Sequence, residues 1–282
     1  MRAFIFPGQG AQTLQMSAEI TAAFPAAVSL YEQAQQVTGV DLLHLTEDQL
    51  AQTRYSQLAI IVHSIACLEK ERAAMTDPAE PIGLAGFSLG EYTALYAAGM
   101  IGFTDLLLLV NERARLMQLA AEKNPGAMYA ILGLTDEKIE TCLSGIEGVY
   151  PVNYNCPGQL VIAGTVEAAE KAAAELLALG ARRAMKLAVN GAFHSPFMAE
   201  AAAALKEFAR SITFAPSTAA ALYSNASAAP VPVGADIPDY LETHMISPVR
   251  FTDEIRRMRL DGYDEFIELG PGKVLTGLVK KI

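Results

Sequence analysis

The chain has 282 residues, of which 52% are hydrophobic and 18% are charged, so it can bury a large core and lacks the composition of a disordered protein. Its formal net charge of −10 argues against nucleic acid as the main partner, because phosphate binding requires a basic surface. Three cysteines without Cys-x-x-Cys spacing argue against a disulfide framework or a metal site and favour the cytoplasm. No apolar run reaches the ~20 residues that cross a bilayer, so we expect no membrane partner.

The pattern in chain order predicts an α/β fold, because short apolar runs alternate with longer Ala- and Leu-rich stretches of helical period. The expected elements of the first half are a strand at 3–6, a Gly-rich turn at 7–10, helices as far as 75, a strand at 81–86, and helices at 90–98 and 105–123.

A different pattern of apolar residues begins after the Asn-Pro-Gly at 124–126. The pattern predicts elements in the order βαββαβ, at 128–134, 136–143, 149–153, 160–163, 166–179 and 183–189. This order is that of the ferredoxin-like arrangement. We therefore predict a small ferredoxin-like subdomain at 127–190, inserted into a larger subdomain formed by 1–126 and 191–282. In the larger one we expect a helix at 196–211 and a late strand at 266–269.

The pentapeptide Gly-Phe-Ser-Leu-Gly at 86–90 lies between a predicted strand and a predicted helix. This is the context of a nucleophile elbow, in which flanking glycines let the backbone turn sharply and expose the serine. The free N–H groups at the start of the following helix favour developing negative charge there. Ser88 is thus a candidate nucleophile. The same pattern also fits a tight turn in which Ser88 only caps the helix.

A serine nucleophile needs a base, and the chain has four histidines. His44 lies in a leucine-flanked stretch and His63 among isoleucines, which favours packing or surface roles. His194 lies between a predicted strand and a predicted helix, a placement that suits an active-site loop. A helix-flanking cap is the alternative for His194.

Four motifs follow one another along the chain: FPGQGAQ at 6–12, GFSLGEY at 86–92, GAFHS at 191–195 and GPGKVL at 270–275. Together they resemble malonyl-CoA:acyl-carrier-protein transacylases, including the acyltransferase domains of polyketide synthases. The resemblance extends from about residue 3 to residue 280. It implies an α/β-hydrolase-like large subdomain with a ferredoxin-like small subdomain, which agrees with the predicted order of elements.

The resemblance also implies roles for individual residues. Ser88 matches the nucleophile and His194 the general base, and the backbone N–H groups of Gln9 and Leu89 match the oxyanion hole. Arg113 matches the arginine that holds the malonyl carboxylate, which a guanidinium can grip with two parallel hydrogen bonds. Without the resemblance, an exposed helix arginine is the alternative, as for its neighbour at 115.

Phe193, directly before His194, resembles the residue of malonyl-selecting domains, where a bulky ring crowds the space for an extra methyl group. Two positions depart from the family pattern. Phe87 stands where histidine is common, and His244 stands where glutamine is common. The family implies that the residue at 244 orients the base through its main-chain carbonyl. A surface loop residue is the alternative for His244.

The implied reaction moves a malonyl group from malonyl-CoA, through malonyl-Ser88, to the phosphopantetheine thiol of an acyl carrier protein in fatty acid or polyketide synthesis. We expect a monomer without a permanently bound cofactor. Because carrier proteins are acidic, docking requires a local basic patch. Its candidates are Arg182, Arg183, Lys186, Lys273, Lys280 and Lys281.

Two other functions remain open on the sequence. The first is a serine hydrolase such as a thioesterase or esterase, although α/β-hydrolases place their histidine late in the chain. The second is a non-catalytic carrier-binding module, which has no need for an intact Ser88, His194 and Arg113.

Overall fold

The computed structural model of the protein describes residues 1–77, 80–219 and 221–282. Its larger sheet has the strand order β8-β7-β2-β1-β9. The strands β1 (Arg2–Phe6), β2 (Gly83–Gly86), β7 (Ala221–Ser224) and β9 (Glu265–Glu268) run parallel, and β8 (Ala229–Pro230) pairs antiparallel with β7.

Helices cover both faces of this sheet. They are α1 (Met16–Ala23), α2 (Ala27–Thr38), α3 (Glu47–Leu50), α4 (Thr53–Ala74), α5 (Gly90–Ala97), α6 (Phe103–Lys123), α9 (Ala199–Ala209), α10 (Ile237–Ile246), α11 (Phe251–Leu260) and α12 (Val274–Val279), with a 3₁₀ turn η1 (Pro196–Met198) before α9. Phe4 and Phe6 face the core formed with α4, α5 and α6, whereas Ala3 and Ile5 face the core formed with α11 and α12. Burial of both faces explains why β1 is continuously apolar rather than alternating.

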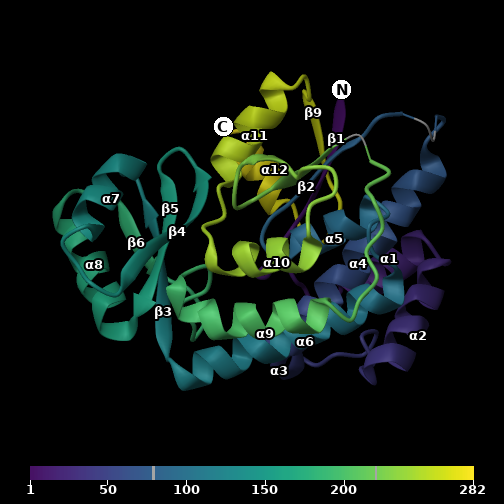
Figure 1. The fold of residues 1–282 in the computed structure, drawn as a ribbon, viewed down its shortest axis with the longest axis horizontal. Coiled ribbons are helices and arrows are strands. Elements are labelled where there is room, and N and C mark those ends of the chain that lie inside the picture. Colours follow the sequence, from purple (N-terminus) through teal and green to yellow (C-terminus); the bar gives the residue numbers. More distant parts are fainter. Residues whose placement is uncertain (78–79, 220) are drawn as a thin grey trace.

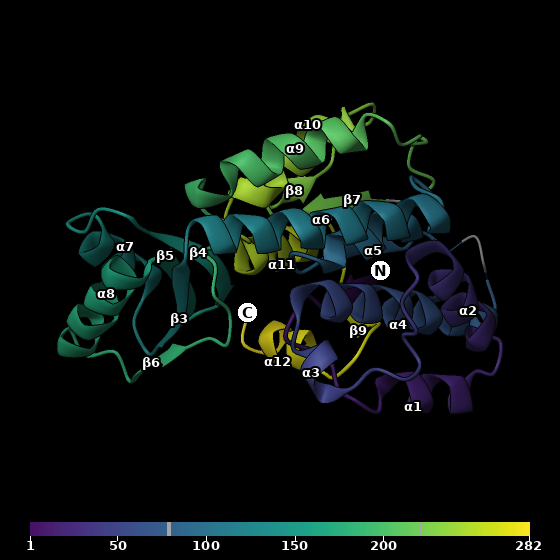
Figure 2. The same cartoon turned by 90° about the horizontal axis from the view of Figure 1, so that it is seen from below.

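The smaller sheet has the order β4-β5-β3-β6 and is antiparallel throughout. Its elements are β3 (Gly126–Leu132), α7 (Asp136–Leu143), β4 (Val149–Cys156), β5 (Gln159–Thr165), α8 (Val166–Ala178) and β6 (Arg183–Lys186). This is the ferredoxin-like order, so the predicted fold class is confirmed. Figures 1 and 2 show this group at one end of the molecule.

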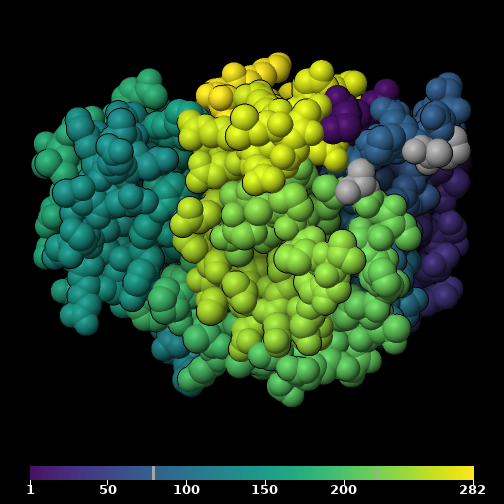
Figure 3. All heavy atoms as spheres, turned by 45° about the horizontal axis from the view of Figure 1, so that its top comes forward, coloured from purple at the N-terminus to yellow at the C-terminus, as the bar shows by residue number. Residues whose placement is uncertain are grey.

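The two faces of the smaller sheet contact different parts of the protein. One face builds a separate core with α7 and α8, in which Ile131 and Ile162 are fully buried. On the other face, Ala130 and Val161 join the large core. The space-filling view shows the small group in contact with the rest of the chain (Figure 3). These contacts support the predicted subdomain boundaries at 127 and 190, which stay a prediction.

Several elements differ from the prediction. The strand expected at 183–189 ends at Lys186, and the residues that follow run as a loop. The strand expected at 128–134 ends at Leu132, because Gly133 turns the chain with a φ of 91°. The elements β7, β8, α10, α11 and α12 were not predicted from the sequence. In the described part of the chain, no helix is both long and apolar enough to cross a membrane.

Two glycines let the turn after β1 lie directly against the turn after β2, and a third lets the chain turn sharply into α5. A Cβ atom on Gly90 would overlap the carbonyl of Phe6, and one on Gly8 would overlap the carbonyl of Phe87. A Cβ on Gly86 would overlap the first backbone atoms of α5. Two chain segments far apart in sequence are thus brought into backbone contact, and this contact forms the floor of the site described below.

Replacing Gly90 by alanine should separate α5 from β1. We expect Gly90→Ala to lower the free energy of unfolding by about 2 kcal/mol, because the new methyl group meets rigid backbone rather than a movable side chain. Chemical denaturation measures this difference.

The matched control is Gly277→Ala in α12, where a Cβ would have no neighbour within 4 Å. Because alanine favours the helix by about 1 kcal/mol over glycine, this variant should be as stable as the parent or more so. Equal stability of the two variants would contradict the close-approach explanation.

Candidate active site

Ser88 lies at the sharp turn between β2 and α5, with a φ of 52° in the left-handed region. This conformation costs a non-glycine residue about 1–2 kcal/mol, so neighbouring contacts must hold it. The amide of Phe87 donates to the carbonyl of Phe6 (2.9 Å), and the amide of Glu91 donates to the carbonyl of Ser88 (3.1 Å). The N-cap residue of α5 is Leu89 rather than Ser88, so the helix-cap alternative is wrong.

The Ser88 hydroxyl contacts the imidazole of His194, with 2.6 Å between Oγ and Nε2. On the other side of the ring, Nδ1 lies 3.1 Å from the carbonyl oxygen of Ser247. A carbonyl can only accept a hydrogen bond, so Nδ1 carries the proton and Nε2 is free to accept one from Ser88. The cap of the following 3₁₀ turn is Ser195, not His194.

The pKa of His194 is lowered to about 4, first by burial and then by the positive charge of Arg113. The imidazole is therefore neutral at pH 7, as a general base must be. Burial and the charged neighbour act in the same direction, since both disfavour the imidazolium form.

His244 was expected to orient the base through its carbonyl. The hydrogen bond of His194 Nδ1 goes to the carbonyl of Ser247, three residues later, while the backbone of His244 also acts to raise the pKa of His194. The orienting role of His244 therefore stays a prediction, and Ser247 was missed. The alternative of a surface loop residue is wrong, because the His244 side chain is buried in α10, edge-on to the His194 ring at 5.7 Å.

Arg113 lies on α6 and is 1% exposed. Its Nη1 donates to Oε1 of Gln57 (2.8 Å), and its Nη2 lies 3.3 Å from Oγ of Ser88. The guanidinium also lies 5.0 Å from the centre of the Tyr92 ring. The exposed-arginine alternative applies instead to Arg115, which pairs with a neighbouring glutamate.

The charge of Arg113 is not neutralised by a salt bridge to any residue that the structure describes, and its Nε atom has no hydrogen-bond partner there. Burial accordingly lowers the pKa of Arg113. A buried cation without an ionic partner is costly, so its presence beside a nucleophile indicates an anionic group supplied from outside the chain.

Gln57 is a functional candidate that the sequence analysis missed. It is fully buried in α4, accepts from Arg113, and donates through Nε2 to Oε1 of Gln9 (3.2 Å). It therefore connects the guanidinium to the turn after β1. Its position within an apolar helix gave no signal, because a buried glutamine is recognisable only when its partners are known.

The support for an oxyanion hole formed by the backbone N–H groups of Gln9 and Leu89 is indirect. Within the described ranges, neither amide has a hydrogen-bond acceptor. The glycines described above place their two turns in contact. Both observations support the predicted oxyanion hole, which stays a prediction.

These side chains line a cavity of about 440 Å³. Ser88, Arg113 and His194 line it from the large group of elements, and Met128 and Leu187 line it from the small one. Phe193 also lines this cavity and a neighbouring one of about 730 Å³, so the two lie side by side. The cavity therefore lies between the two sheets, and the loop after β6 forms one wall.

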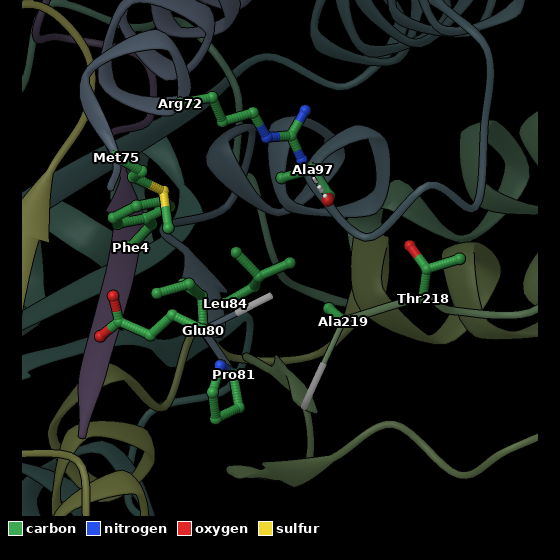
Figure 4. Close-up of a pocket in the computed structure, with 10 residues that line it drawn as sticks. Phe4, Arg72, Met75, Glu80, Pro81, Leu84, Ala97, Thr218 and Ala219 are labelled. Atoms are coloured by element: carbon green, nitrogen blue, oxygen red, sulfur yellow. Dashed lines mark hydrogen bonds between the residues drawn. The ribbon is translucent and has the colours of Figure 1, made fainter. Parts of the chain in front are cut away.

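The other residues singled out from the sequence lie partly at this cavity and partly away from it. Phe87 lines the cavity and packs edge-on against Phe251, with 5.5 Å between ring centres. His44 is paired with Asp41 at the surface, and His63 is buried in α4. A separate cavity of about 590 Å³ is lined by none of the predicted site residues (Figure 4). Within residues 1–77, 80–219 and 221–282, no three metal-ligating side chains form a metal site.

A serine on a strand-to-helix turn, bonded to a neutral imidazole, is the arrangement of the serine-nucleophile enzymes. Within that class, residues 3–281 match the acyl transferase domain family, and the chain belongs to it. The chain is 40% identical to the malonyl CoA-acyl carrier protein transacylase of Bacillus subtilis, with 99% of this chain and 90% of the relative covered.

Solved structures show the same likeness. An acyl carrier protein S-malonyltransferase from Vibrio cholerae is 37% identical, with a TM-score of 0.92 and coverage of 99% of this chain and 92% of the other. A malonyl-transacylase solved in complex with a type II PKS acyl-carrier protein is also 37% identical, with a TM-score of 0.93 and the same coverage. At this similarity, the fold of the chain is that of the family.

The low pKa of His194 predicts a specific pH dependence. The base works when neutral, so the reactivity of Ser88 toward a neutral fluorophosphonate should stay constant as pH falls and decline only near the pKa of about 4. Removing the nearby cation with Arg113→Gln should raise this pKa and move the decline to higher pH.

Arg115→Gln is the control, since it removes an equal charge from the exposed face of α6 and should leave the profile unchanged. Circular dichroism at each pH confirms that the protein is folded. A decline centred near pH 6.5 in the unmodified protein would contradict the assigned environment of His194.

Proposed function

We propose that the protein transfers a malonyl group from malonyl-CoA to the phosphopantetheine thiol of an acyl carrier protein, through a malonyl-Ser88 intermediate. Family membership and the activity named for its relatives support this reaction. The observation that best supports malonyl as the acyl group is the buried guanidinium of Arg113, which forms no salt bridge among the described residues and lies 3.3 Å from the Ser88 hydroxyl. A malonyl group carries a carboxylate two carbons from its thioester carbonyl, which suits a cation beside the nucleophile.

In the first half-reaction, His194 Nε2 accepts the proton of Ser88 as Oγ attacks the thioester carbonyl. The oxyanion accepts hydrogen bonds from the amides of Gln9 and Leu89. When it collapses, the carbon–sulfur bond breaks, coenzyme A leaves with the proton from His194, and malonyl-Ser88 remains. The Ser247 carbonyl holds the imidazole in the tautomer that this step requires.

In the second half-reaction, the carrier thiol occupies the place that coenzyme A has left. His194 accepts the thiol proton, and the sulfur attacks the malonyl ester. The Ser88–acyl bond then breaks and the proton returns from His194 to Oγ. Arg113 holds the malonyl carboxylate in both steps, and Phe193 limits the space around the acyl chain.

The two alternative functions, a serine hydrolase and a non-catalytic carrier-binding module, have less support. A hydrolase triad places an acidic side chain on the histidine, whereas Nδ1 of His194 bonds to a backbone carbonyl. A non-catalytic module has no need for the 2.6 Å contact between Ser88 and His194 or for a left-handed serine. Release of free malonate at the rate of transfer would favour the hydrolase.

We further propose that the protein works in the cytoplasm as a monomer without a bound cofactor. Its three cysteines are unpaired, and one chain supplies the described lining of the cavity.

Two of the basic residues that are candidates for docking the carrier protein have partners within the chain. Lys186 pairs with Glu170, and Lys273 donates to the carbonyl of Glu268. Arg182, Arg183, Lys280 and Lys281 therefore remain the better candidates for contacting an acidic carrier.

Ser88→Ala should abolish the covalent adduct. Intact-protein mass spectrometry after incubation with malonyl-CoA should show a malonyl adduct on the parent protein, and peptide mapping should place it on Ser88. The alanine variant should show none, because no other hydroxyl contacts Nε2 of His194 in the described residues. A persistent adduct of the same mass would exclude Ser88 as the nucleophile.

Arg113→Ala should change acyl selectivity. We expect kcat/KM for malonyl-CoA to fall on the order of 100-fold, because two charge-assisted hydrogen bonds are lost, while transfer from acetyl-CoA rises. Competition between the two thioesters measures the ratio. Arg115→Ala is the control from the same helix, and unchanged selectivity in Arg113→Ala would remove Arg113 from the acyl site.

A further inference from the structure

A buried polar cluster lies behind the nucleophile elbow, and Asn225 is at its centre. Asn225 directly follows β7 and is 1% exposed. Its Oδ1 accepts from the backbone N–H of Ser88 (2.7 Å), and its Nδ2 donates to the carbonyl of Gly86 (2.5 Å). One side chain therefore holds the backbone on both sides of Phe87, at the strained turn itself.

This contact extends the sheet beyond its last backbone pair. β7 pairs with β2 at Gly83 and Leu84, and the strand then turns away into the elbow. The planar carboxamide of Asn225 offers one acceptor and one donor side by side, as a backbone peptide does. It thus takes the place of a strand partner for two groups that the sharp turn would otherwise leave unpaired.

Two carboxyl side chains accept further hydrogen bonds from Asn225. Its backbone N–H donates to Oε2 of Glu91 on α5 (2.8 Å), and its Nδ2 also donates to Oε2 of Glu254 on α11 (2.8 Å). Both carboxyls are buried, and burial raises the pKa of each, that of Glu254 to about 8. Placing two acids beside one amide is costly, which indicates that the orientation of this amide matters.

We propose that Asn225 is a positioning residue that, oriented by Glu91 and Glu254, holds Ser88 in its left-handed conformation with the hydroxyl toward His194. This inference rests on the proposed role of Ser88 as the nucleophile. It also explains which amides are free for the oxyanion: the N–H of Ser88 is occupied by Asn225, so that of Leu89 is the donor that the elbow can offer.

Asn225→Asp tests this role with almost no change in shape. The acceptor toward Ser88 is kept, but the donor toward the Gly86 carbonyl becomes an oxygen, so the side chain at 225 is repelled from one side of the elbow. Because a small misplacement of a reacting group typically costs on the order of 100-fold in rate, we expect kcat to fall by about that factor with little change in KM for malonyl-CoA.

The double variant Asn225→Asp/Glu254→Gln restores a donor opposite the new oxygen. We expect it to recover about tenfold of the lost kcat, whereas Glu254→Gln alone should lower kcat by only about threefold, because the glutamine keeps an acceptor for Nδ2 of Asn225. Rescue of this kind distinguishes positioning of Ser88 from a general loss of stability. Asn155→Asp is the matched control, since Asn155 is a second buried asparagine, on β4, without a contact to the elbow.

A parent-like kcat in Asn225→Asp would overturn the proposal. So would a loss of kcat that the double variant does not rescue, or one that Asn155→Asp shows equally. If the parent protein formed no malonyl adduct, the proposed function would fail instead. The rate at which a fluorophosphonate labels Ser88 in the same four variants would then still measure the positioning role.

Discussion

The backbone contact between the turn after β1 and the turn after β2 is the constraint on which the site depends. Gly8 and Gly90 permit it, because a side chain at either position would meet backbone atoms of the other turn. The contact brings Gln9 beside the elbow and fixes where α5 begins. Ser88 must then adopt a φ of 52°, and its hydroxyl emerges from the turn toward the cavity. The backbone strain at Ser88 is local, and it is offset by the hydrogen bonds that the elbow makes with β1, with α5 and with the residue after β7.

Buried ionisable groups lie on two sides of this turn. On the cavity side, Arg113 is buried without an ionic partner among the described residues, which leaves its charge for a ligand and helps to keep His194 neutral. On the opposite side, Glu91 and Glu254 are buried with raised pKa values and hold Asn225. In the proposed reaction the Arg113 cation binds the acyl group, and the two acids hold the backbone that carries Ser88.

The ferredoxin-like insert completes the site rather than merely adjoining it. Met128 and Leu187 line the cavity, while the opposite face of the same sheet has its own core with α7 and α8. The loop after β6 forms a wall because the strand stops at Lys186. This arrangement places the cavity between two groups of elements, and both groups contribute side chains to its lining.

The sequence by itself determined the α/β class, the order of the small subdomain and the candidates Ser88 and His194. These follow from local signals: apolar periodicity, glycine spacing and a histidine between a strand and a helix. The role of Arg113 required the resemblance to the family, since a helix arginine at 113 and one at 115 are indistinguishable locally. Only the tertiary structure decided that Gln57, Ser247 and Asn225 belong to the site. The physical reason is that each acts through a partner at least 50 positions away in the chain, and no local pattern encodes a hydrogen bond that folding alone brings together.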